Sequence, residues 1–217
     1  MPPEHVSYLG AAEIRSLADT LGLSPQKSLG QNFLHDANTV RKIVQLASLP
    51  AQAEVVEVGP GFGSLTIGLL DAGASVTAVE MDPRLADALP EVIAHHAPGA
   101  PLQVIQADAL RWVDVPATAT HLVANLPYNV AVPVVIHLLS VHPGFSRVVV
   151  MVQAEVGWRL AAAPGTEHYG APSVKVAWWG NWRVAFPVSR RVFWPEPRVD
   201  SVLVEMHQVD PPGDEAL

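Results

Sequence analysis

Cysteine is absent from this sequence of 217 residues, which excludes disulfide bonds and thiolate metal sites. No uninterrupted apolar run reaches the ~18 residues that a membrane-spanning helix needs. The first residues also lack the basic and then apolar pattern of a secretory signal. The nine histidines show no HxxxH or HExxH spacing, so we expect no metal site. Together these absences favour a cytoplasmic protein.

Apolar residues, by contrast, are plentiful and make up 49% of the chain. The length fits one substantial domain with a well-filled core. The net charge of −8 argues against indiscriminate nucleic-acid binding. Between residues 171 and 198, however, five basic residues stand against one acid, Glu196. Such a patch can hold phosphates because salt screens charges beyond about 8–10 Å, although a solvated face has the same composition. The basic residues are Lys175, Arg183, Arg190, Arg191 and Arg198.

Strands and helices are predicted to alternate from residue 54 onward. The expected strands are nearly continuous apolar runs, which predicts a parallel sheet covered by helices on both faces. Two later segments, Ser173–Trp179 and Val199–Met206, have no helical pattern between them, and we expect them to form an antiparallel pair at one edge. The expected strands are 54–58, 75–80, 102–107, 121–124 and 147–152, and the expected helices are 11–23, 37–48, 64–72, 83–96, 132–140 and 154–163.

A glycine-rich turn, Glu57-Val-Gly-Pro-Gly-Phe-Gly63, follows the first of these strands and precedes a helix. Glycines tolerate positive φ angles and remove side chains that would block a ligand. The spacing is GxGxG rather than GxGxxG, and a tight strand-to-helix turn without a ligand has the same pattern. The turn therefore predicts a nucleotide site only in combination with other features.

Two acidic residues supply such features, because each ends one of the next two strands. Glu80 follows Gly59 by 21 residues, and in an open parallel sheet its strand end lies beside the glycine turn. A carboxylate there can accept both ribose hydroxyls, of NAD as well as of S-adenosylmethionine. Asp108, one strand further along, can accept a hydrogen bond from an adenine amino group. Exposed strand ends or helix caps remain the alternative for each acid alone.

The tetrapeptide Asn125-Leu-Pro-Tyr128 ends the fourth strand on the same edge. An aromatic amine is a poor nucleophile because its lone pair is delocalised into the ring. If the Asn125 side-chain oxygen and the Leu126 carbonyl accept its hydrogens, the lone pair is directed toward a methyl donor. Pro127 stiffens the turn without a competing N–H, and Tyr128 can stack on the base. The motif therefore favours methylation of a nitrogen such as adenine N6, although asparagine and proline also occur in plain turns.

These motifs together resemble the bacterial small-subunit (16S) rRNA adenine N6,N6-dimethyltransferase family, in particular its actinobacterial members. The resemblance runs from about Lys27 to Glu205. It rests on Ser28-Leu-Gly-Gln-Asn-Phe-Leu34, Glu57-Val-Gly-Pro-Gly61, Glu80, Asp108, Asn125-Leu-Pro-Tyr128 and Phe193-Trp-Pro-Glu-Pro-Arg-Val-Asp-Ser201.

The resemblance implies an α/β fold of the Rossmann-like class I type, with a mostly parallel seven-stranded sheet and helices on both faces. We expect the methyltransferase domain at residues 51–207, after a helical segment and cofactor-covering loop at 1–50 and before a tail at 208–217. The implied cofactor is S-adenosyl-L-methionine. The residues expected to bind it are Gln31, Asn32, Leu34, Gly59, Gly61, Glu80, Met81, Asp108, Ala109 and Asn125.

The catalytic residues implied by the resemblance are Asn125, Leu126, Pro127 and Tyr128, together with Phe193. Phe193 is expected to stack on a flipped adenine from the face opposite Tyr128. The residues alone show only an aromatic side chain in a proline-rich loop beside basic residues, and a core anchor for that loop fits them as well.

The sequence departs from the family in two ways. Members usually continue into a C-terminal helical domain that helps to grip rRNA, whereas this sequence stops at Leu217. Ala154 also stands where many members carry lysine. Both departures bear on RNA affinity more than on cofactor binding. The expected partner is small-subunit rRNA or the pre-ribosomal small subunit, and we expect the protein to be a monomer.

Alternatives remain open at this point. A large-subunit rRNA adenine methyltransferase of the macrolide-resistance type shares the fold and the Asn125–Tyr128 motif, although the Phe193–Ser201 segment favours the small-subunit family. A non-catalytic RNA-binding assembly or transcription factor keeps the fold without needing an intact motif. A nicotinamide dehydrogenase would need an acid–base pair for hydride transfer that this sequence does not supply.

Overall fold

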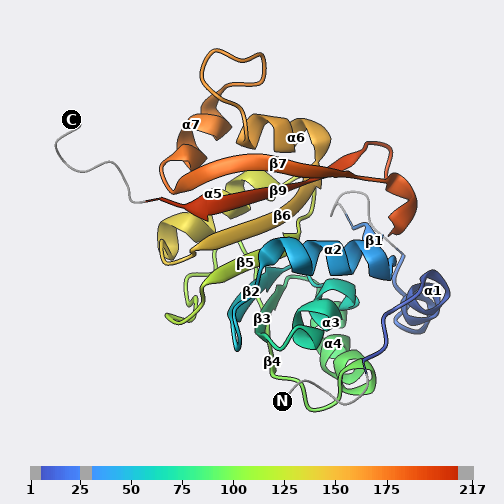
Figure 1. Cartoon of the computed structure of the whole chain (residues 1–217). Helices are drawn as coiled ribbons and strands as arrows, with labels where there is room; N and C mark the ends of the chain where they lie inside the picture. The colour runs from blue at the N-terminus through green and yellow to red at the C-terminus, as the bar shows by residue number, and fades with distance from the viewer. Residues whose placement is uncertain (1–5, 25–30, 210–217) are drawn as a thin grey trace.

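The computed structural model describes residues 6–24 and 31–209. A seven-stranded sheet lies at its centre, in the order β4-β3-β2-β5-β6-β9-β7 (Figure 1). Neighbouring strands from β4 to β6 pair in parallel, and β9 runs antiparallel to both β6 and β7. The prediction of a mostly parallel seven-stranded sheet is confirmed. The strands are β2 (Glu54–Val58), β3 (Ser75–Glu80), β4 (Leu102–Gln106), β5 (His121–Asn125), β6 (Arg147–Gln153), β7 (Gly180–Val188) and β9 (Ser201–Gln208).

Each central strand contributes side chains to two hydrophobic cores, one on either face of the sheet. In β6, Val148, Val150 and Val152 belong to one core, whereas Val149 and Met151 belong to the other. Successive side chains of a strand point to opposite faces. A strand that is covered on both sides must therefore be apolar at nearly every position, and this explains the valine run in the sequence.

Helices supply the other half of each core. The first core includes residues of α1 (Ala11–Thr20), α2 (Ala37–Ala47), α3 (Ser64–Asp71) and α4 (Pro83–His96). The second includes residues of α5 (Ala131–Val141), α6 (Ala154–Leu160) and α7 (Ala171–Ala177). None of the helices in the described part of the chain is long and apolar enough to span a membrane.

Two helices begin at acidic caps. Asp36 accepts a hydrogen bond from the Thr39 amide at 2.7 Å, at the start of α2. Asp82 accepts one from the Arg84 amide at 3.0 Å, and Pro83 occupies the first turn of α4. Each carboxylate satisfies an amide that the helix itself leaves unpaired. The predicted helix at 83–96 has the observed bounds.

Described residues before β2 pack against α3 and the first core. The Tyr8 hydroxyl donates to Asp71 at 2.7 Å, and the Arg41 guanidinium lies 4.7 Å from the centre of the Tyr8 ring. Val40 and Ile43 of α2 belong to the same core as the first three strands. The assignment of residues 1–50 as a separate functional segment stays a prediction.

A second, two-stranded sheet joins distant parts of the chain. β1 (Phe33–Leu34) pairs antiparallel with β8 (Phe193–Trp194), which follows the short helix η2 (Arg190–Val192). Part of the predicted motif, residues 28–30, and the tail from residue 210 lie outside the described residues.

One predicted strand is wrong. Residues 173–179 lie largely in α7 rather than in an extended strand, and the edge strand that pairs antiparallel with β9 is β7. Ser173 and Val176 are the buried positions of α7, three residues apart as on a helix face, and Pro172 favours a first turn. β7 is hard to see in the sequence because it is a half-exposed edge strand that contains Pro187.

The close packing of α6 on β9 depends on Gly157. A Cβ atom at this position would lie 2.2 Å from a methyl group of Val202 and 2.9 Å from one of Val204. We predict that Gly157→Ala lowers the free energy of unfolding by roughly 1–3 kcal/mol, because the core must shift to admit the methyl group.

Chemical denaturation of the purified variant measures this loss. Glu91→Ala is the control, since Glu91 lies at an exposed position of α4, and we expect it to change the stability by less than ~0.5 kcal/mol. Equal stabilities for the two variants would contradict the packing argument.

Candidate active site

A cavity of about 670 Å³ opens where the parallel strands β2, β3, β4 and β5 end. The order of the strands reverses between β2 and β5, which is where open α/β sheets bind their ligands. The volume is in the range of small-molecule sites. All the predicted site residues except Phe193 line this cavity. They are Gln31, Asn32, Leu34, Gly59, Gly61, Glu80, Met81, Asp108, Ala109, Asn125, Leu126, Pro127 and Tyr128.

The glycine turn forms one wall of the cavity. Gly59 and Gly61 have φ angles of 66° and 58°, in the left-handed region that favours glycine. A Cβ on Gly61 would lie 2.8 Å from the Phe33 ring, so only glycine lets β1 approach this closely. A Cβ on Gly59 would lie 3.6 Å from the Pro127 ring. The turn therefore packs against Phe33 of β1 on one side and against the Asn125–Tyr128 segment on the other.

Glu80 lies at the end of β3 and is buried. Its carboxylate accepts hydrogen bonds from the backbone N–H of Gly61 at 3.2 Å and from those of Met81 and Asp82 at 2.9 Å each. Burial raises the pKa of Glu80, while these hydrogen bonds oppose that shift. The carboxylate is fixed in place at the cavity wall, beside the glycine turn, in the position that the sequence predicted.

Asp108 follows β4 at the next strand end. Its Oδ1 accepts from the Leu110 amide at 2.9 Å, and its Oδ2 lies 3.8 Å from the Arg111 guanidinium. Ala109 is buried beside it. These contacts turn the chain sharply after the strand and hold the carboxylate at the cavity wall.

The Asn125–Tyr128 segment is fixed by the sheet and by a distant loop. The Leu126 amide donates to the Met151 carbonyl at 3.1 Å, which continues the pairing of β5 with β6. The Asn125 Nδ2 donates to the main-chain oxygen of Asn32 at 3.0 Å. Because the amide nitrogen is engaged, the Asn125 side-chain oxygen is the atom left to accept a hydrogen bond from a ligand.

Tyr128 makes the other long-range contact of this segment. Its hydroxyl forms a hydrogen bond of 2.6 Å with the Ser201 hydroxyl at the start of β9. Burial raises the pKa of Tyr128, so the phenol is neutral at physiological pH. Tyr128 therefore lines the cavity as an uncharged aromatic residue.

Phe193 is the exception among the predicted site residues. It lies opposite Leu34 in the β1–β8 pair, it is 3% exposed, and it belongs to the first core. Leu34, not Phe193, reaches the cavity wall. The structure therefore places Phe193 as a core anchor behind the loop, and stacking on a ligand would require that pair to shift.

The basic residues between 171 and 198 do not form one patch. Lys175 lies on α7, Arg183 pairs with the buried Glu205, and Arg190 lies 3.3 Å from Asp200. The strand β7 separates Arg183 from Arg190, and strands rise about 3.3 Å per residue. These basic residues are close in the sequence, but the fold places Lys175 and Arg183 apart from Arg190.

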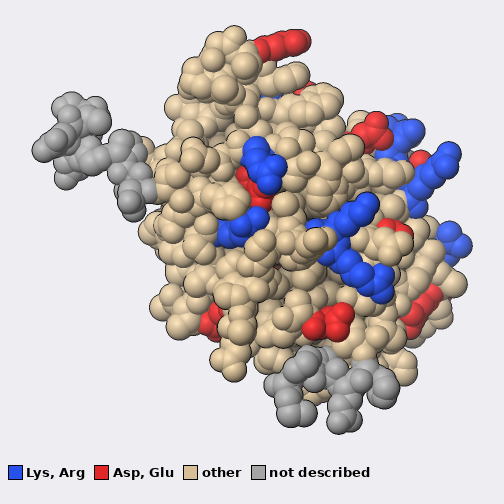
Figure 2. Space-filling model, viewed as in Figure 1, with Lys and Arg blue, Asp and Glu red and all other residues tan. Residues whose placement is uncertain are grey.

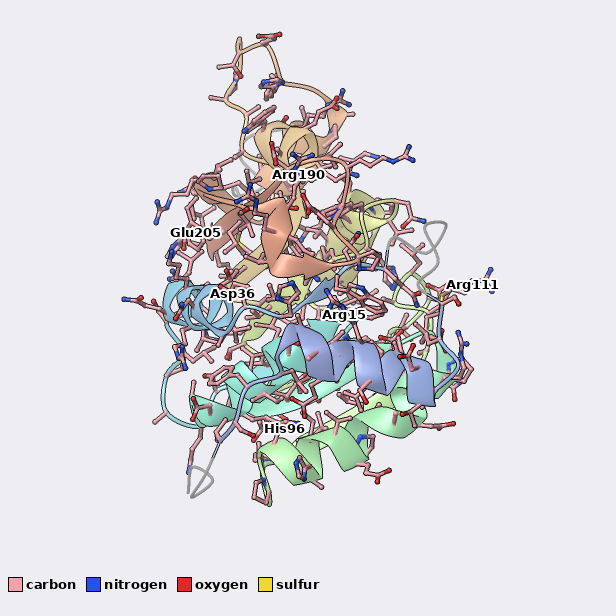
Figure 3. The ribbon with its side chains drawn as sticks, turned by 90° about the vertical axis from the view of Figure 1, so that its right-hand side faces the viewer. Arg15, Asp36, His96, Arg111, Arg190 and Glu205 are labelled. Carbon is pink, nitrogen blue, oxygen red and sulfur yellow. The ribbon has the colours of Figure 1, made fainter. Side chains whose placement is uncertain are left out.

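Arg84 lines the cavity, and several further arginines lie on one side of the molecule. Figure 3, which faces the side where β1 and α1 lie in Figure 1, shows Arg15 of α1 and Arg190 of η2, with Arg111 of the turn after β4 at the edge of the view. Arg191 and Arg198 are exposed, and neither has an ion pair with an acid in the described part of the chain. In Figure 2, Lys and Arg side chains gather toward this side. No group of acids and histidines suited to a metal ion occurs among residues 6–24 and 31–209.

Glu57 is a cavity residue that the sequence argument passed over, although it begins the glycine motif. It is 1% exposed in β2, and its carboxyl accepts from the Thr66 hydroxyl at 2.7 Å. Burial, with a smaller contribution from the charge of Glu80, raises the pKa of Glu57 to about 8. An acid placed between valines inside a strand was the signal that could have identified it.

This pKa predicts a pH dependence of stability. Between the unfolded pKa of ~4.3 and the folded value of about 8, only the folded protein binds this proton. Stability should therefore fall as pH rises through this window, by up to ~1.4 kcal/mol per pH unit from this one group. Urea unfolding of wild type and of Glu57→Gln, near pH 5 and near pH 8, measures the effect. The variant should show the smaller loss, and equal losses would contradict the assignment.

Comparisons with known proteins agree with this geometry. The family model described as ribosomal RNA adenine dimethylase matches residues 22–217. The ribosomal RNA small subunit methyltransferase A of Leifsonia xyli is 58% identical over 211 residues, covering 95% of this chain and 75% of that protein. The protein of the same name from Nocardia farcinica is 56% identical over 211 residues, covering 95% of this chain and 72% of its own length.

Solved structures show the same fold. A dimethyladenosine transferase from Plasmodium falciparum superposes with a TM-score of 0.73 at 28% identity, over 82% of this chain and 63% of that one. The 23S rRNA methyltransferase ErmE gives a TM-score of 0.72 at 31% identity, over 83% of this chain and 71% of its own. This chain belongs to the ribosomal RNA adenine dimethylase family.

Proposed function

We propose that this protein transfers methyl groups from S-adenosyl-L-methionine to N6 of adenines in small-subunit rRNA, giving N6,N6-dimethyladenosine during ribosome assembly. The observation that carries the proposal is the Asn125 amide, whose nitrogen is held by Asn32 in the cavity that also contains the glycine turn and Glu80. The names of the relatives from Leifsonia and Nocardia support the choice of small-subunit rRNA.

The cofactor would lie along the ends of β2, β3 and β4. Glu80 is placed to accept the ribose hydroxyls, and Asp108 to accept from the adenine amino group. The glycine turn has no side chain to obstruct the cofactor, and Gln31, Asn32 and Leu34 line the cavity from the loop that includes β1. When bound, S-adenosylmethionine supplies an electrophilic methyl group on a sulfonium sulfur.

Asn125 and Leu126 would activate the target amine. The Asn125 side-chain oxygen and the Leu126 carbonyl accept the N6 hydrogens, so the nitrogen lone pair turns out of the ring and toward the methyl carbon. As the new N–C bond forms, the C–S bond breaks, and the surplus proton leaves from nitrogen to water. Pro127 and Tyr128 hold the base in line, so most of the rate enhancement comes from orientation. The second transfer needs the same pocket to admit a monomethylated amine.

The large-subunit alternative rests on the likeness to ErmE, whose printed name specifies 23S rRNA. The identity to the small-subunit enzyme of Leifsonia is 58%, against 31% to ErmE, and this difference favours the small-subunit substrate. A non-catalytic role fits less well, because the motif residues and the cofactor-binding residues converge on one cavity.

RNA would approach from the side that carries Arg15, Arg111 and Arg190 (Figure 3), because cations that neutralise phosphates supply most of the sequence-independent affinity for nucleic acids. Action on assembling ribosomal subunits also implies a cytoplasmic location. A monomer is sufficient for this chemistry, since a single chain contains every residue that the proposal uses.

The role of Glu80 predicts the effect of Glu80→Gln on cofactor affinity. The amide cannot accept hydrogen bonds on both of its polar atoms, and hydrogen bonds to charged groups are each worth about 1.5–3 kcal/mol. We expect the dissociation constant for S-adenosylmethionine to rise roughly tenfold to hundredfold in calorimetry. Asp87→Asn, on the exposed face of α4, should bind as wild type does. Unchanged affinity of the Glu80 variant would remove Glu80 from the cofactor site.

The proposed reaction is tested by transfer of labelled methyl groups to unmethylated small-subunit particles, followed by nucleoside analysis. We expect dimethyladenosine on these particles and none on large-subunit rRNA. Asn125→Ala should lower the rate by at least ~100-fold, as removal of an oriented transition-state contact does. Asn181→Ala, at an exposed position of β7, should keep the wild-type rate. Transfer to large-subunit rRNA alone would replace the proposal with the ErmE-like alternative.

A further inference from the structure

The hydrogen bond between Tyr128 and Ser201 joins two segments that are 73 residues apart in sequence. Tyr128 follows β5, and Ser201 begins β9. In the sheet, β6 lies between these two strands. The bond of 2.6 Å therefore crosses the end of β6, and it ties the catalytic segment to the antiparallel part of the sheet.

Ser201 is held more rigidly than Tyr128. It is fully buried and is paired on both sides, opposite Gln153 of β6 and Val188 of β7. The main-chain carbonyl of the preceding residue, Asp200, accepts a hydrogen bond from the Ala154 amide at 2.9 Å. This bond joins the start of β9 to the start of α6. The Ser201 hydroxyl is therefore a fixed point at the carboxyl edge of the sheet.

Tyr128, by contrast, lies in a turn. The Val130 amide donates to the Pro127 carbonyl at 3.2 Å, and within the described residues Ser201 is the one hydrogen-bond partner of the Tyr128 hydroxyl. Among residues 6–24 and 31–209, no other hydrogen bond restrains the rotation of the Tyr128 ring about its side-chain bonds. Tyr128 also lines the cavity, so the orientation of its ring would determine the surface that a bound base meets.

We propose that Ser201 is a positioning residue that holds the Tyr128 ring in the orientation required for methyl transfer. This inference rests on the proposed function and adds a residue to which no role in the reaction has been given. Ser201 does not reach the cavity wall itself, so it acts through Tyr128. A freely rotating ring would still admit the base but would hold the amine out of line with the methyl group. The second transfer is the more sensitive step, because the monomethylated amine has only one orientation that directs its lone pair toward the donor.

The inference is tested by steady-state methyl transfer to small-subunit particles with Ser201→Ala, Tyr128→Phe and the double variant. Both single variants remove the same hydrogen bond, one from each side. We expect kcat to fall roughly tenfold to hundredfold, the cost of a misplacement near 1 Å, with KM for the particles changed by less than about twofold. The double variant should be no slower than the slower single variant, because the bond can be lost only once. The ratio of monomethyl to dimethyl product should rise in all three.

Ser173→Ala is the matched control, since Ser173 is also buried and its hydroxyl donates a hydrogen bond to the Arg159 carbonyl at 2.5 Å, and neither residue lines the cavity. We expect this variant to lose thermal stability while keeping the wild-type kcat and product ratio. A Ser201→Ala protein that loses only stability would overturn the inference, and so would multiplicative losses of kcat in the double variant. The wild-type reaction in the same assay separates this outcome from failure of the proposed function, which would abolish transfer in every protein.

Discussion

The parallel pairing of β2 with β5 is the contact on which the rest of the site depends. Val56 lies opposite Leu122 in this pair, although the two strands are separated by two complete strand–helix units. Parallel strands end on the same edge of a sheet, so this pairing brings the glycine turn and Asn125 together. A Cβ on Gly59 would lie 3.9 Å from the Asn125 carbonyl oxygen. One register therefore sets the relative positions of the proposed methyl-donor site and the proposed amine site.

The remaining walls of the cavity depend on contacts between more distant segments. The loop before β1 reaches Asn125 through the Asn32 carbonyl, and β1 is itself paired with β8 near the end of the chain. Ser201 reaches Tyr128 from β9. The Asn125–Tyr128 segment is therefore oriented by contacts from segments that lie far apart in the sequence. Such fixed polar groups need little reorganisation when charge shifts during the reaction.

Two buried acids beside the cavity have raised pKa values, and they differ in their hydrogen-bond donors. Glu80 is surrounded by backbone N–H donors, which oppose the rise in its pKa that burial causes. Glu57 has the Thr66 hydroxyl as its donor, and its pKa rises to about 8. The Glu57 carboxyl is therefore largely protonated at neutral pH. Both acids are buried, but Glu80 has three backbone donors whereas Glu57 has one hydroxyl donor.

Much of this protein follows from local patterns in the sequence. The apolar runs determined the central strands, the cap at Asp82 with Pro83 determined the start of α4, and the glycine turn with Glu80, Asp108 and Asn125 indicated the cavity. These features are local, because periodicity, capping and positive φ angles act within a few residues. Their convergence also follows from the rule that parallel strands end on a common edge.

The tertiary structure decided what depends on partners far along the chain. It buried Phe193 in its pairing with Leu34 and separated Arg183 from Arg190. It also joined Tyr128 to Ser201. None of these outcomes has a local signature, because each depends on which surface a segment packs against, and packing between distant segments is fixed only when the whole sheet has formed.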